Sequence, residues 1–263
     1  MRAISLSKET AYMRILITND DGIHAEGIRA LARRLSEKHQ VVVVAPDNER
    51  SGASHSITLT APLRVRRTSI PAAPEIEAYK VNGAPADCVI IGCRALDIKP
   101  DLILSGINHG YNLGVDVHYS GTVSAAMEGA MQGIPSMAVS MEGFTSVDFS
   151  VPARIADELI PEFVQSGCML FNVNVPDIPY DELKGIKYTR LSDRVCFAPF
   201  EKRKDPRDID YYWWPCRAEY DGDPQADNDE RWTNEGYVSV TPIMTNSTNE
   251  AALCSLKRIK EQL

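Results

Sequence analysis

Several patterns that assign a protein class at once are missing from this 263-residue sequence. It has no apolar stretch of about 18 residues, so we expect no transmembrane helix and no membrane partner. The first twelve residues lack the apolar centre of a secretory signal. The six cysteines are scattered and form no Cys-x-x-Cys pair, which argues against a zinc ribbon or a disulfide framework. We therefore expect buried thiols in a reducing, cytoplasmic environment.

Positive charge is also scarce. The chain has 28 Lys and Arg against 36 Asp and Glu, a formal net charge of −8. Basic residues occur only in short clusters such as Lys202-Arg203-Lys204. We therefore do not expect the protein to bind a nucleic-acid polymer through its phosphates. An acidic protein still binds a small anionic substrate when a metal cation supplies the local positive charge.

Three catalytic signatures are absent as well. No Gly-x-Gly-x-x-Gly follows the first apolar run, which argues against a dinucleotide-binding enzyme. No Gly-x-Ser-x-Gly elbow is present, and no Gly-Lys-Ser/Thr follows the small residues of 120–126, so neither an α/β-hydrolase nucleophile nor a Walker A loop is indicated. Ser51 would be a nucleophile only beside a base, and the sequence does not fix His55 there.

Short continuous apolar runs, typical of strands buried on both faces, alternate with helical patterns through the first two-thirds of the chain. The strands are expected at 14–18, 41–45, 101–106, 135–140 and 168–175, and the helices at 25–39, 85–95, 119–133 and 150–165. This alternation predicts a Rossmann-like, three-layer α/β/α fold with a mostly parallel sheet. We expect an N-terminal extension over 1–12 and an α/β core over 13–185.

The last third reads differently. Residues 186–263 predict a protruding β-hairpin, a return strand at 237–241 and a C-terminal helix at 249–263, together an expected oligomerisation region. The hairpin carries four consecutive aromatic residues, Tyr211, Tyr212, Trp213 and Trp214. An exposed aromatic patch often marks an oligomer contact, and a locally packed hairpin explains the residues equally well.

Polar clusters follow the expected strands, at 19–22, 46–56, 105–114 and 118–130. Parallel strands bring their carboxyl ends to one edge of a sheet, so these loops are expected to converge there. Asp20, Asp21, Ser51 and Asn108 then form an all-oxygen ligand set, which suits Mg²⁺ or Mn²⁺ and is poor for zinc. A cation would offset the repulsion between adjacent carboxylates. The alternative for Asp20-Asp21 is a helix cap followed by a solvated turn acid.

The fourth cluster opens a helix with small and hydroxyl residues. Ser120, Gly121 and Thr122 are placed to hold a phosphate with the help of the helix dipole, or to form an ordinary Ser/Thr cap. Three histidines flank the polar clusters and are candidates for ligand positioning or proton transfer, His24, His109 and His118. His39 is expected at the surface, where a helix ends.

In this order, the clusters resemble the SurE family of metal-dependent nucleoside-monophosphate phosphatases. The matching stretches are "RILITNDDGIHAEGI", "VVVVAPDNERSGASHSIT", "VNGAPADCV", "PDLILSGINHGYNLGVDVHYSGTVSAAMEG", "GIPSMAVS", "FNVNVP" and "GYVSVTP". The resemblance implies a Rossmann-like core, one divalent cation per subunit (Mg²⁺ or Mn²⁺) and assembly as a homodimer or homotetramer. The metal ligands that it implies are Asp20, Asp21, Ser51 and Asn108.

The sequence departs from that family's pattern in three places. Gly83-Ala84-Pro85 stands where Gly-Thr-Pro is usual, Ser124 stands where glycine is common, and 221–235 does not closely match the usual Thr-Asp pattern. These departures leave the metal set intact and bear on the choice of base and sugar.

The resemblance implies hydrolysis of nucleoside 5′-monophosphates, and also of 3′-monophosphates or short polyphosphate in some members. As catalytic residues we expect Asp20 or Asp21 to orient or deprotonate the attacking water. The remaining phosphate oxygens are expected to bind Asn112, Ser120, Gly121 and Thr122. Two alternatives are a broad phosphomonoesterase or exopolyphosphatase, and a nucleotide-binding regulatory protein without turnover.

Overall fold

The computed structural model describes residues 12–71, 73–143, 148–193, 200–214 and 226–262. Its strands are β1 (Arg14–Thr18), β2 (Gln40–Pro46), β3 (Val65–Ile70), β4 (Ala73–Val81), β5 (Leu102–His109), β6 (Ser136–Met141), β7 (Leu170–Val175), β8 (Ile186–Tyr188), β9 (Glu201–Lys204), β10 (Asp210–Trp213) and β11 (Val238–Pro242). Its helices are α1 (Glu26–Ser36), α2 (Pro85–Ile90), α3 (Gly121–Met131), α4 (Ser150–Ser166), α5 (Asp229–Asn234) and α6 (Glu250–Gln262), with short helical turns η1 (Ile91–Ala95), η2 (Gly114–His118) and η3 (Tyr180–Glu182).

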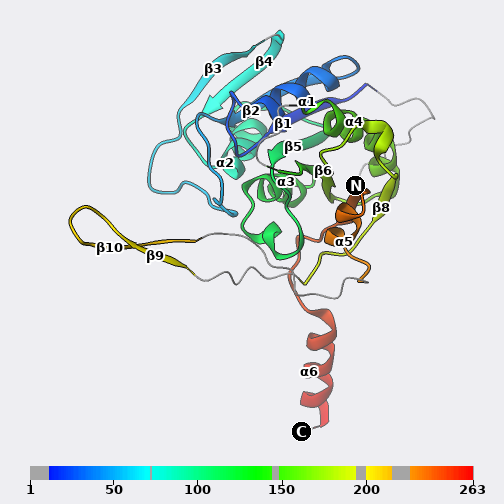
Figure 1. The fold of residues 1–263 in the computed structure, drawn as a ribbon. Coiled ribbons are helices and arrows are strands. Elements are labelled where there is room, and N and C mark those ends of the chain that lie inside the picture. The colour runs from blue at the N-terminus through cyan, green and yellow to red at the C-terminus, as the bar shows by residue number, and fades with distance from the viewer. Residues whose placement is uncertain (1–11, 72, 144–147, 194–199, 215–225, 263) are drawn as a thin grey trace.

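Nine of these strands form one sheet in the order β3-β4-β2-β1-β5-β6-β7-β11-β8. Strands β4, β2, β1, β5, β6 and β7 run parallel, and the antiparallel pairs β3–β4 and β7–β11 lie toward the two edges. Helices α1 and α4 pack together on one face, and α2 and α3 on the other (Figure 1). The predicted three-layer α/β/α fold with a mostly parallel sheet is confirmed.

The sequence missed β3 and β4. These two strands lie at one edge of the sheet, where apolar positions alternate with exposed charged ones such as Arg66 and Glu75. Strands that are covered on both faces have continuous apolar sequences. An edge hairpin of this kind is partly exposed and lacks that pattern. At the other edge, β8 and β11 complete the main sheet beside β7. The division at residue 185 stays a prediction, because strand pairing does not reveal whether two segments fold independently.

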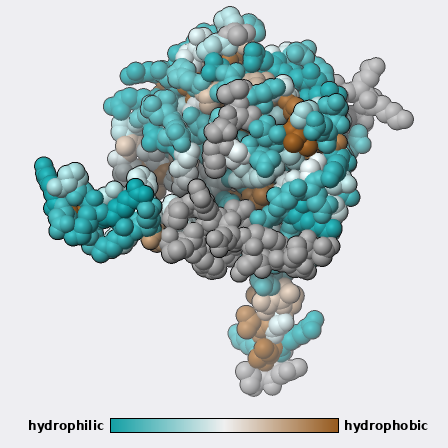
Figure 2. All heavy atoms as spheres, viewed as in Figure 1, coloured by the Kyte–Doolittle hydropathy of each residue, from teal (hydrophilic) through white to brown (hydrophobic). Residues whose placement is uncertain are grey.

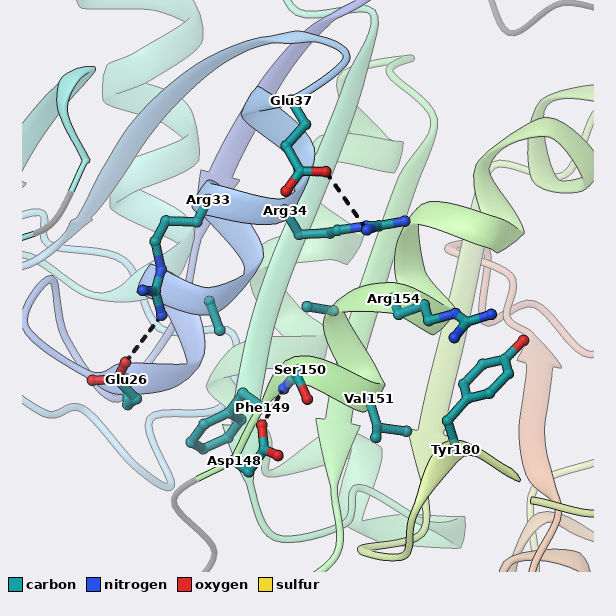
Figure 3. A pocket seen from close by; sticks show the side chains of 12 residues that line it. Glu26, Arg33, Arg34, Glu37, Asp148, Phe149, Ser150, Val151, Arg154 and Tyr180 are labelled. Carbon is teal, nitrogen blue, oxygen red and sulfur yellow. Dashed lines mark hydrogen bonds and ion pairs between the residues drawn. The ribbon is translucent and has the colours of Figure 1, made fainter. Parts of the chain in front are cut away.

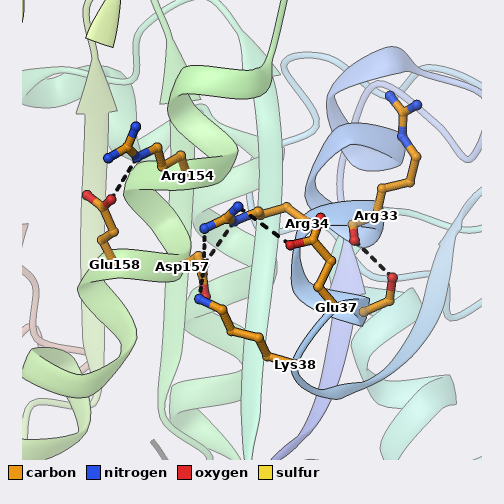
Figure 4. Close-up of polar contacts among 8 residues, drawn as sticks. Arg33, Arg34, Glu37, Lys38, Arg154, Asp157 and Glu158 are labelled. Carbon is orange, nitrogen blue, oxygen red and sulfur yellow. Dashed lines mark hydrogen bonds and ion pairs between the residues drawn. The ribbon is translucent and has the colours of Figure 1, made fainter. Parts of the chain in front are cut away.

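A buried carboxylate joins the two helices that cover one face of the sheet (Figure 4). The Asp157 side chain of α4 is only 3% exposed, and its Oδ2 lies 2.8 Å from Nη2 of Arg34 and 2.7 Å from Nζ of Lys38. Arg34 belongs to α1, and Lys38 lies two residues beyond the end of that helix. The two cations neutralise a charge that burial would otherwise penalise, so the contact fixes the packing of α1 on α4.

Two elements project from the body (Figure 1): the β9–β10 hairpin and helix α6. On the hairpin, Tyr212 is 57% exposed and Trp213 is 58% exposed, so in the single chain these aromatics are not packed against the core. Helix α6 exposes Leu256 and Ile259. Figure 2 shows that the projecting helix carries both hydrophobic (brown) and hydrophilic (teal) residues at its surface. Within the described residues, no helix has the length and apolar character needed to cross a membrane.

Candidate active site

The turn after β1 is closed by a buried asparagine. The Asn19 side chain donates from Nδ2 to the carbonyl of Gly22 at 3.0 Å, and its Oδ1 accepts from the backbone N–H of Gly22 at 3.2 Å. Gly22 has φ +94°, a conformation that is strained for other residues. This turn carries Asp20 and Asp21 at the carboxyl end of β1, where a parallel sheet forms its sites.

Helix α3 begins against Asp20. The Thr122 hydroxyl and the backbone N–H of Thr122 donate to the Asp20 carboxylate. A Cβ added to Gly121 would lie 2.8 Å from Cβ and 3.0 Å from Oδ2 of Asp20, so only glycine permits this approach. Burial raises the pKa of Asp20, and the bonds from Thr122 act in the opposite direction. The positive end of the helix dipole also favours the carboxylate form.

Asp21 is the more exposed of the two acids. Burial raises the pKa of Asp21 to about 6, with a further contribution from the neighbouring Asp20 charge. The backbone N–H of His109 donates to its carboxylate and partly counters that rise. Its Oδ2 is buried and has no hydrogen-bond partner among the described residues. A buried acceptor of this kind is costly unless a cation or donor meets it.

Ser51 lies on the loop after β2, which reaches the same edge. The backbone N–H of Arg50 donates to the carbonyl of Asp20 at 2.7 Å, which places this loop directly beside the acid pair. The Ser51 hydroxyl donates to Oε1 of Glu49 at 2.8 Å. The Glu49 charge also raises the pKa of both Asp20 and Asp21, so it acts as a third negative charge near the pair.

Asn108 lies near the end of β5, next to the residue whose backbone holds Asp21. Its Nδ2 donates to the carbonyl of Gly110 at 2.8 Å. That bond fixes the orientation of the amide and leaves Oδ1 as the atom that would meet a cation. Two neighbouring strands, β1 and β5, thus bring Asp20, Asp21 and Asn108 to one edge of the sheet.

The donor set fits a hard divalent cation. Carboxylate, hydroxyl and amide oxygens are ligands that Mg²⁺ and Mn²⁺ prefer, and a cation would relieve both the unpartnered Asp21 oxygen and the repulsion from Asp20 and Glu49. The described residues contain no group of three or more His, Cys, Asp or Glu side chains arranged to hold a metal. Four protein oxygens would leave positions for water and substrate oxygens around a six-coordinate cation.

The four residues expected to bind phosphate take different places. The Ser120 hydroxyl accepts from the backbone N–H of Val123 at 3.1 Å and caps α3, while the Thr122 hydroxyl is bonded to Asp20. The Asn112 side chain is buried, and its Nδ2 donates to Oγ of Ser140 at 2.7 Å. These contacts favour supporting roles for the side chains of Ser120, Thr122 and Asn112. The start of α3 near Gly121 stays the predicted phosphate position.

Asp229 is a further buried carboxylate, which the sequence did not predict. Asp229, in the first turn of α5, accepts from the backbone N–H of Gly114 at 2.9 Å and of Ser192 at 2.8 Å. Burial raises the pKa of Asp229, and these backbone bonds oppose that rise. Asp229 therefore ties η2, which precedes Ser120, to the C-terminal part of the chain. Its signal in the sequence was the helix-capping pair Asn228-Asp229, within the stretch 221–235 that departs from the family's usual Thr-Asp pattern.

The histidines lie near the site, at the surface and in the core. The His109 ring packs on Phe149 with centroids 4.7 Å apart, and its charge lowers the pKa of Asp21. His24 and His118 are exposed. The expectation that His39 lies at the surface is wrong: it is 5% exposed, and its Nδ1 accepts from the backbone N–H of Met13 at 3.4 Å. Burial lowers the pKa of His39, because the start of β1 covers it.

A separate hollow of about 520 Å³ lies between α1 and α4, on the helical face behind Phe149 (Figure 3). Its arginines are already paired with acids: Arg33 with Glu26 at 3.5 Å, and Arg154 with Glu158 at 2.8 Å. The Arg154 guanidinium also lies 3.4 Å from the ring centroid of Tyr180. With its charges internally neutralised, this hollow offers no chemistry that selects a ligand, unlike the acid-rich edge.

Comparison with known proteins shows which family this chain is similar to. The family described as "Survival protein SurE" matches residues 15–197. A protein named "5'-nucleotidase SurE" from Thermosipho melanesiensis is 49% identical over 255 residues, covering 95% of this chain and 97% of the relative. One of the same name from Synechococcus elongatus is 42% identical, covering 94% and 99%. The crystal structure of the Aquifex aeolicus SurE protein is 39% identical and superposes with TM-score 0.77, covering 94% of this chain and 99% of that one.

Proposed function

The chain belongs to the SurE family, and from this premise we propose that its acid-rich edge is the active site of a 5′-nucleotidase. The enzyme hydrolyses nucleoside 5′-monophosphates to nucleoside and phosphate. The observation that carries the proposal is the pair at the end of β1: Asp20 is buried, and the half-buried Asp21 has a buried Oδ2 atom that is unpartnered among the described residues. A surface turn acid or a helix cap would be solvated or bonded and would not explain that atom.

The proposed metal ligands are Asp20, Asp21, Ser51 and Asn108. When bound, a divalent cation supplies charge neutralisation at the phosphate and lowers the pKa of a nearby water. The chain's own contribution begins with Thr122, which holds the Asp20 carboxylate in one orientation. Asp21 is then the acid with the freer oxygen, and we assign to it the orientation of the attacking water and acceptance of its proton.

The phosphate is proposed to lie over the start of α3. Backbone N–H groups in the first turn of a helix point at an anion, and the helix dipole favours its charge. Because Gly121 has no side chain, the Asp20 carboxylate lies directly against the start of the helix, beside the proposed phosphate position. The Ser120 and Thr122 hydroxyls and the backbone N–H groups of Thr122 and Val123 are already bonded within the protein, so the Gly121 N–H is the first-turn group proposed to meet the phosphate.

The direct test is phosphate release from AMP with Mg²⁺ or Mn²⁺, its loss with EDTA and its recovery on adding Mn²⁺. The Asp20→Asn variant is expected to lose at least about 100-fold in kcat/KM, because it removes a ligand charge from the site. Asp181→Asn is the matched control, an exposed acid on η3. If Asp20→Asn keeps the parent rate at saturating metal, the proposed site is wrong.

Substrate range is tested with the same protein. Comparing kcat/KM for AMP, GMP, CMP, 3′-AMP, p-nitrophenyl phosphate and polyphosphate separates a nucleotidase from a broad phosphomonoesterase or exopolyphosphatase. Binding of AMP without turnover would instead indicate a regulatory nucleotide-binding protein.

We propose a cytoplasmic location for the enzyme.

We also propose that the chain forms a homodimer or homotetramer through the projecting elements. A two-stranded hairpin is marginally stable alone, and β9–β10 exposes Tyr212 and Trp213 to solvent in the single chain. Light scattering after size exclusion measures the assembly. Changing Tyr212 and Trp213 to serine is expected to shift the protein toward monomer, whereas an unchanged mass would assign the contact elsewhere.

A further inference from the structure

The loop between β2 and β3 carries Ser51 and has no helix or strand of its own from residue 47 to 64. The position of its backbone must therefore be fixed by contacts with the rest of the protein. The contact nearest Ser51 is the bond from the Arg50 backbone N–H to the Asp20 carbonyl. Three residues after Ser51, the Ser54 N–H donates to the carbonyl of Tyr119 at 3.0 Å, and the Ser54 hydroxyl donates to the carbonyl of His118 at 2.6 Å.

The next contact joins two side chains. Nε2 of His55 lies 3.0 Å from Oε2 of Glu128, a residue of α3. The other carboxylate oxygen of Glu128 accepts from Nε2 of Gln132 at 2.9 Å. The His55 and Glu128 side chains are 28% and 13% exposed, so the pair is partly shielded from water. The hydrogen bond from His55 lowers the pKa of Glu128, which keeps that acceptor ionised.

Helix α3 therefore serves both halves of the candidate metal site. Its first turn holds the Asp20 carboxylate through Thr122, and Glu128, farther along the same helix, holds the loop that carries Ser51. A helix is stiff over this length, so the two contacts fix the position of Ser51 relative to Asp20. The loop has a second anchor beyond His55, where the Thr58 hydroxyl donates to Oδ2 of Asp87 at 2.7 Å.

We propose that His55 and Glu128 are positioning residues, which hold the Ser51 loop against α3 so that the Ser51 hydroxyl is preset for the divalent cation. The inference rests on the proposed metal site. Neither residue touches substrate; each acts through Ser51. Without the contact, the loop keeps only its other bonds to the body, and the extra cost of ordering Ser51 when the cation binds appears as weaker metal binding.

The experiment measures Mn²⁺ binding by titration calorimetry without substrate, on the full-length protein. We expect His55→Ala to weaken Mn²⁺ binding by about tenfold, the size of one hydrogen bond to a charged group. His55→Gln is the rescue variant, because its amide nitrogen reaches the place of Nε2, and it should bind within about twofold of the parent. Gln132→Ala is the matched control: it removes a bond to the same Glu128 carboxylate and leaves the His55 contact in place.

Two further readouts separate positioning from a general loss of structure. Hydrogen exchange of the metal-free His55→Ala protein should rise in the peptide that contains 50–56 and stay unchanged in the strands of the sheet. At saturating Mn²⁺ the kcat for AMP should return to within about twofold of the parent, since the ligands themselves are intact. A loss of kcat that metal does not restore would overturn the positioning role.

The inference fails if His55→Ala binds Mn²⁺ as the parent does, if Gln132→Ala weakens binding equally, or if exchange in 50–56 does not change. The Asp20→Asn variant distinguishes this failure from that of the proposed site. If Asp20→Asn abolishes Mn²⁺ binding and His55→Ala does not weaken it, only the positioning role is wrong. If Asp20→Asn binds normally, the metal site itself is misplaced.

Discussion

The Thr122 hydroxyl donates a hydrogen bond to Oδ1 of Asp20, a contact between residues 102 positions apart in the chain. It joins the end of β1 to the first turn of α3, the two elements that meet at the candidate site. A threonine that was expected to bind phosphate therefore holds a carboxylate in place. Four predictions follow from this arrangement and from the packing behind it.

Thr122→Val keeps the shape of the side chain and removes the donor. We expect kcat/KM for AMP at saturating Mg²⁺ to fall by about tenfold or more, because a bond to a charged group is lost at a buried ligand. Thr122→Ser keeps the hydroxyl and should retain most of the activity. Parental activity in Thr122→Val, or an equal loss in Thr122→Ser, would contradict a specific role for the bond to Asp20.

Gly121→Ala places a Cβ 2.8 Å from Cβ of Asp20. Alanine normally stabilises a helix relative to glycine by about 1 kcal/mol, so a purely helical effect would raise the melting temperature. We expect the damage to the site to outweigh any gain in helix stability. The added Cβ displaces the carboxylate, so activity falls at least about tenfold, while the helix content measured by circular dichroism is unchanged. A variant with parental kcat/KM would mean that the site tolerates the shift.

Asp21 should titrate near pH 6 in the metal-free protein. Its folded pKa lies above the ordinary value of 3.8, so its contribution to stability is fully present below that value and is lost as the pH rises through about 6. The metal-free protein should thus lose stability over this window, and added Mg²⁺ should restore it and release a proton. Carboxyl carbon NMR measures the titration. Asp21→Asn should remove this titration, and an unchanged curve would assign it to another group.

Asp157→Ala tests the contact between α1 and α4. Removing the buried carboxylate leaves Arg34 and Lys38 without their shared partner, and we expect the free energy of unfolding to fall by about 1–2 kcal/mol. Glu158→Ala, the next residue and a 38% exposed partner of Arg154, is the matched control and should cost about 0.5 kcal/mol. Urea unfolding measures both. Equal costs would show that burial of Asp157 adds nothing.

Much of the core could be predicted from the sequence, because buried parallel strands have continuous apolar sequences. Residues 14–18 and 135–140 lie within one residue of the observed β1 and β6, and the helix expected at 150–165 is α4. Strands β3 and β4 were not readable in this way, since their exposed edge positions mix charge with apolar residues. The burial of His39 also escaped, because it depends on β1 covering the end of another element.

For the site, the sequence alone determined the chemistry: adjacent acids after a strand, with a serine and an asparagine after two others, define an oxygen-rich set without regard to distance. Only the tertiary structure decided how those groups are held. The bond from Thr122 to Asp20, the contact of His55 with Glu128 and the clamp of Asp229 on Gly114 each join segments far apart in the chain. Local propensity cannot specify such pairs, because their partners meet only after the sheet and helices have packed.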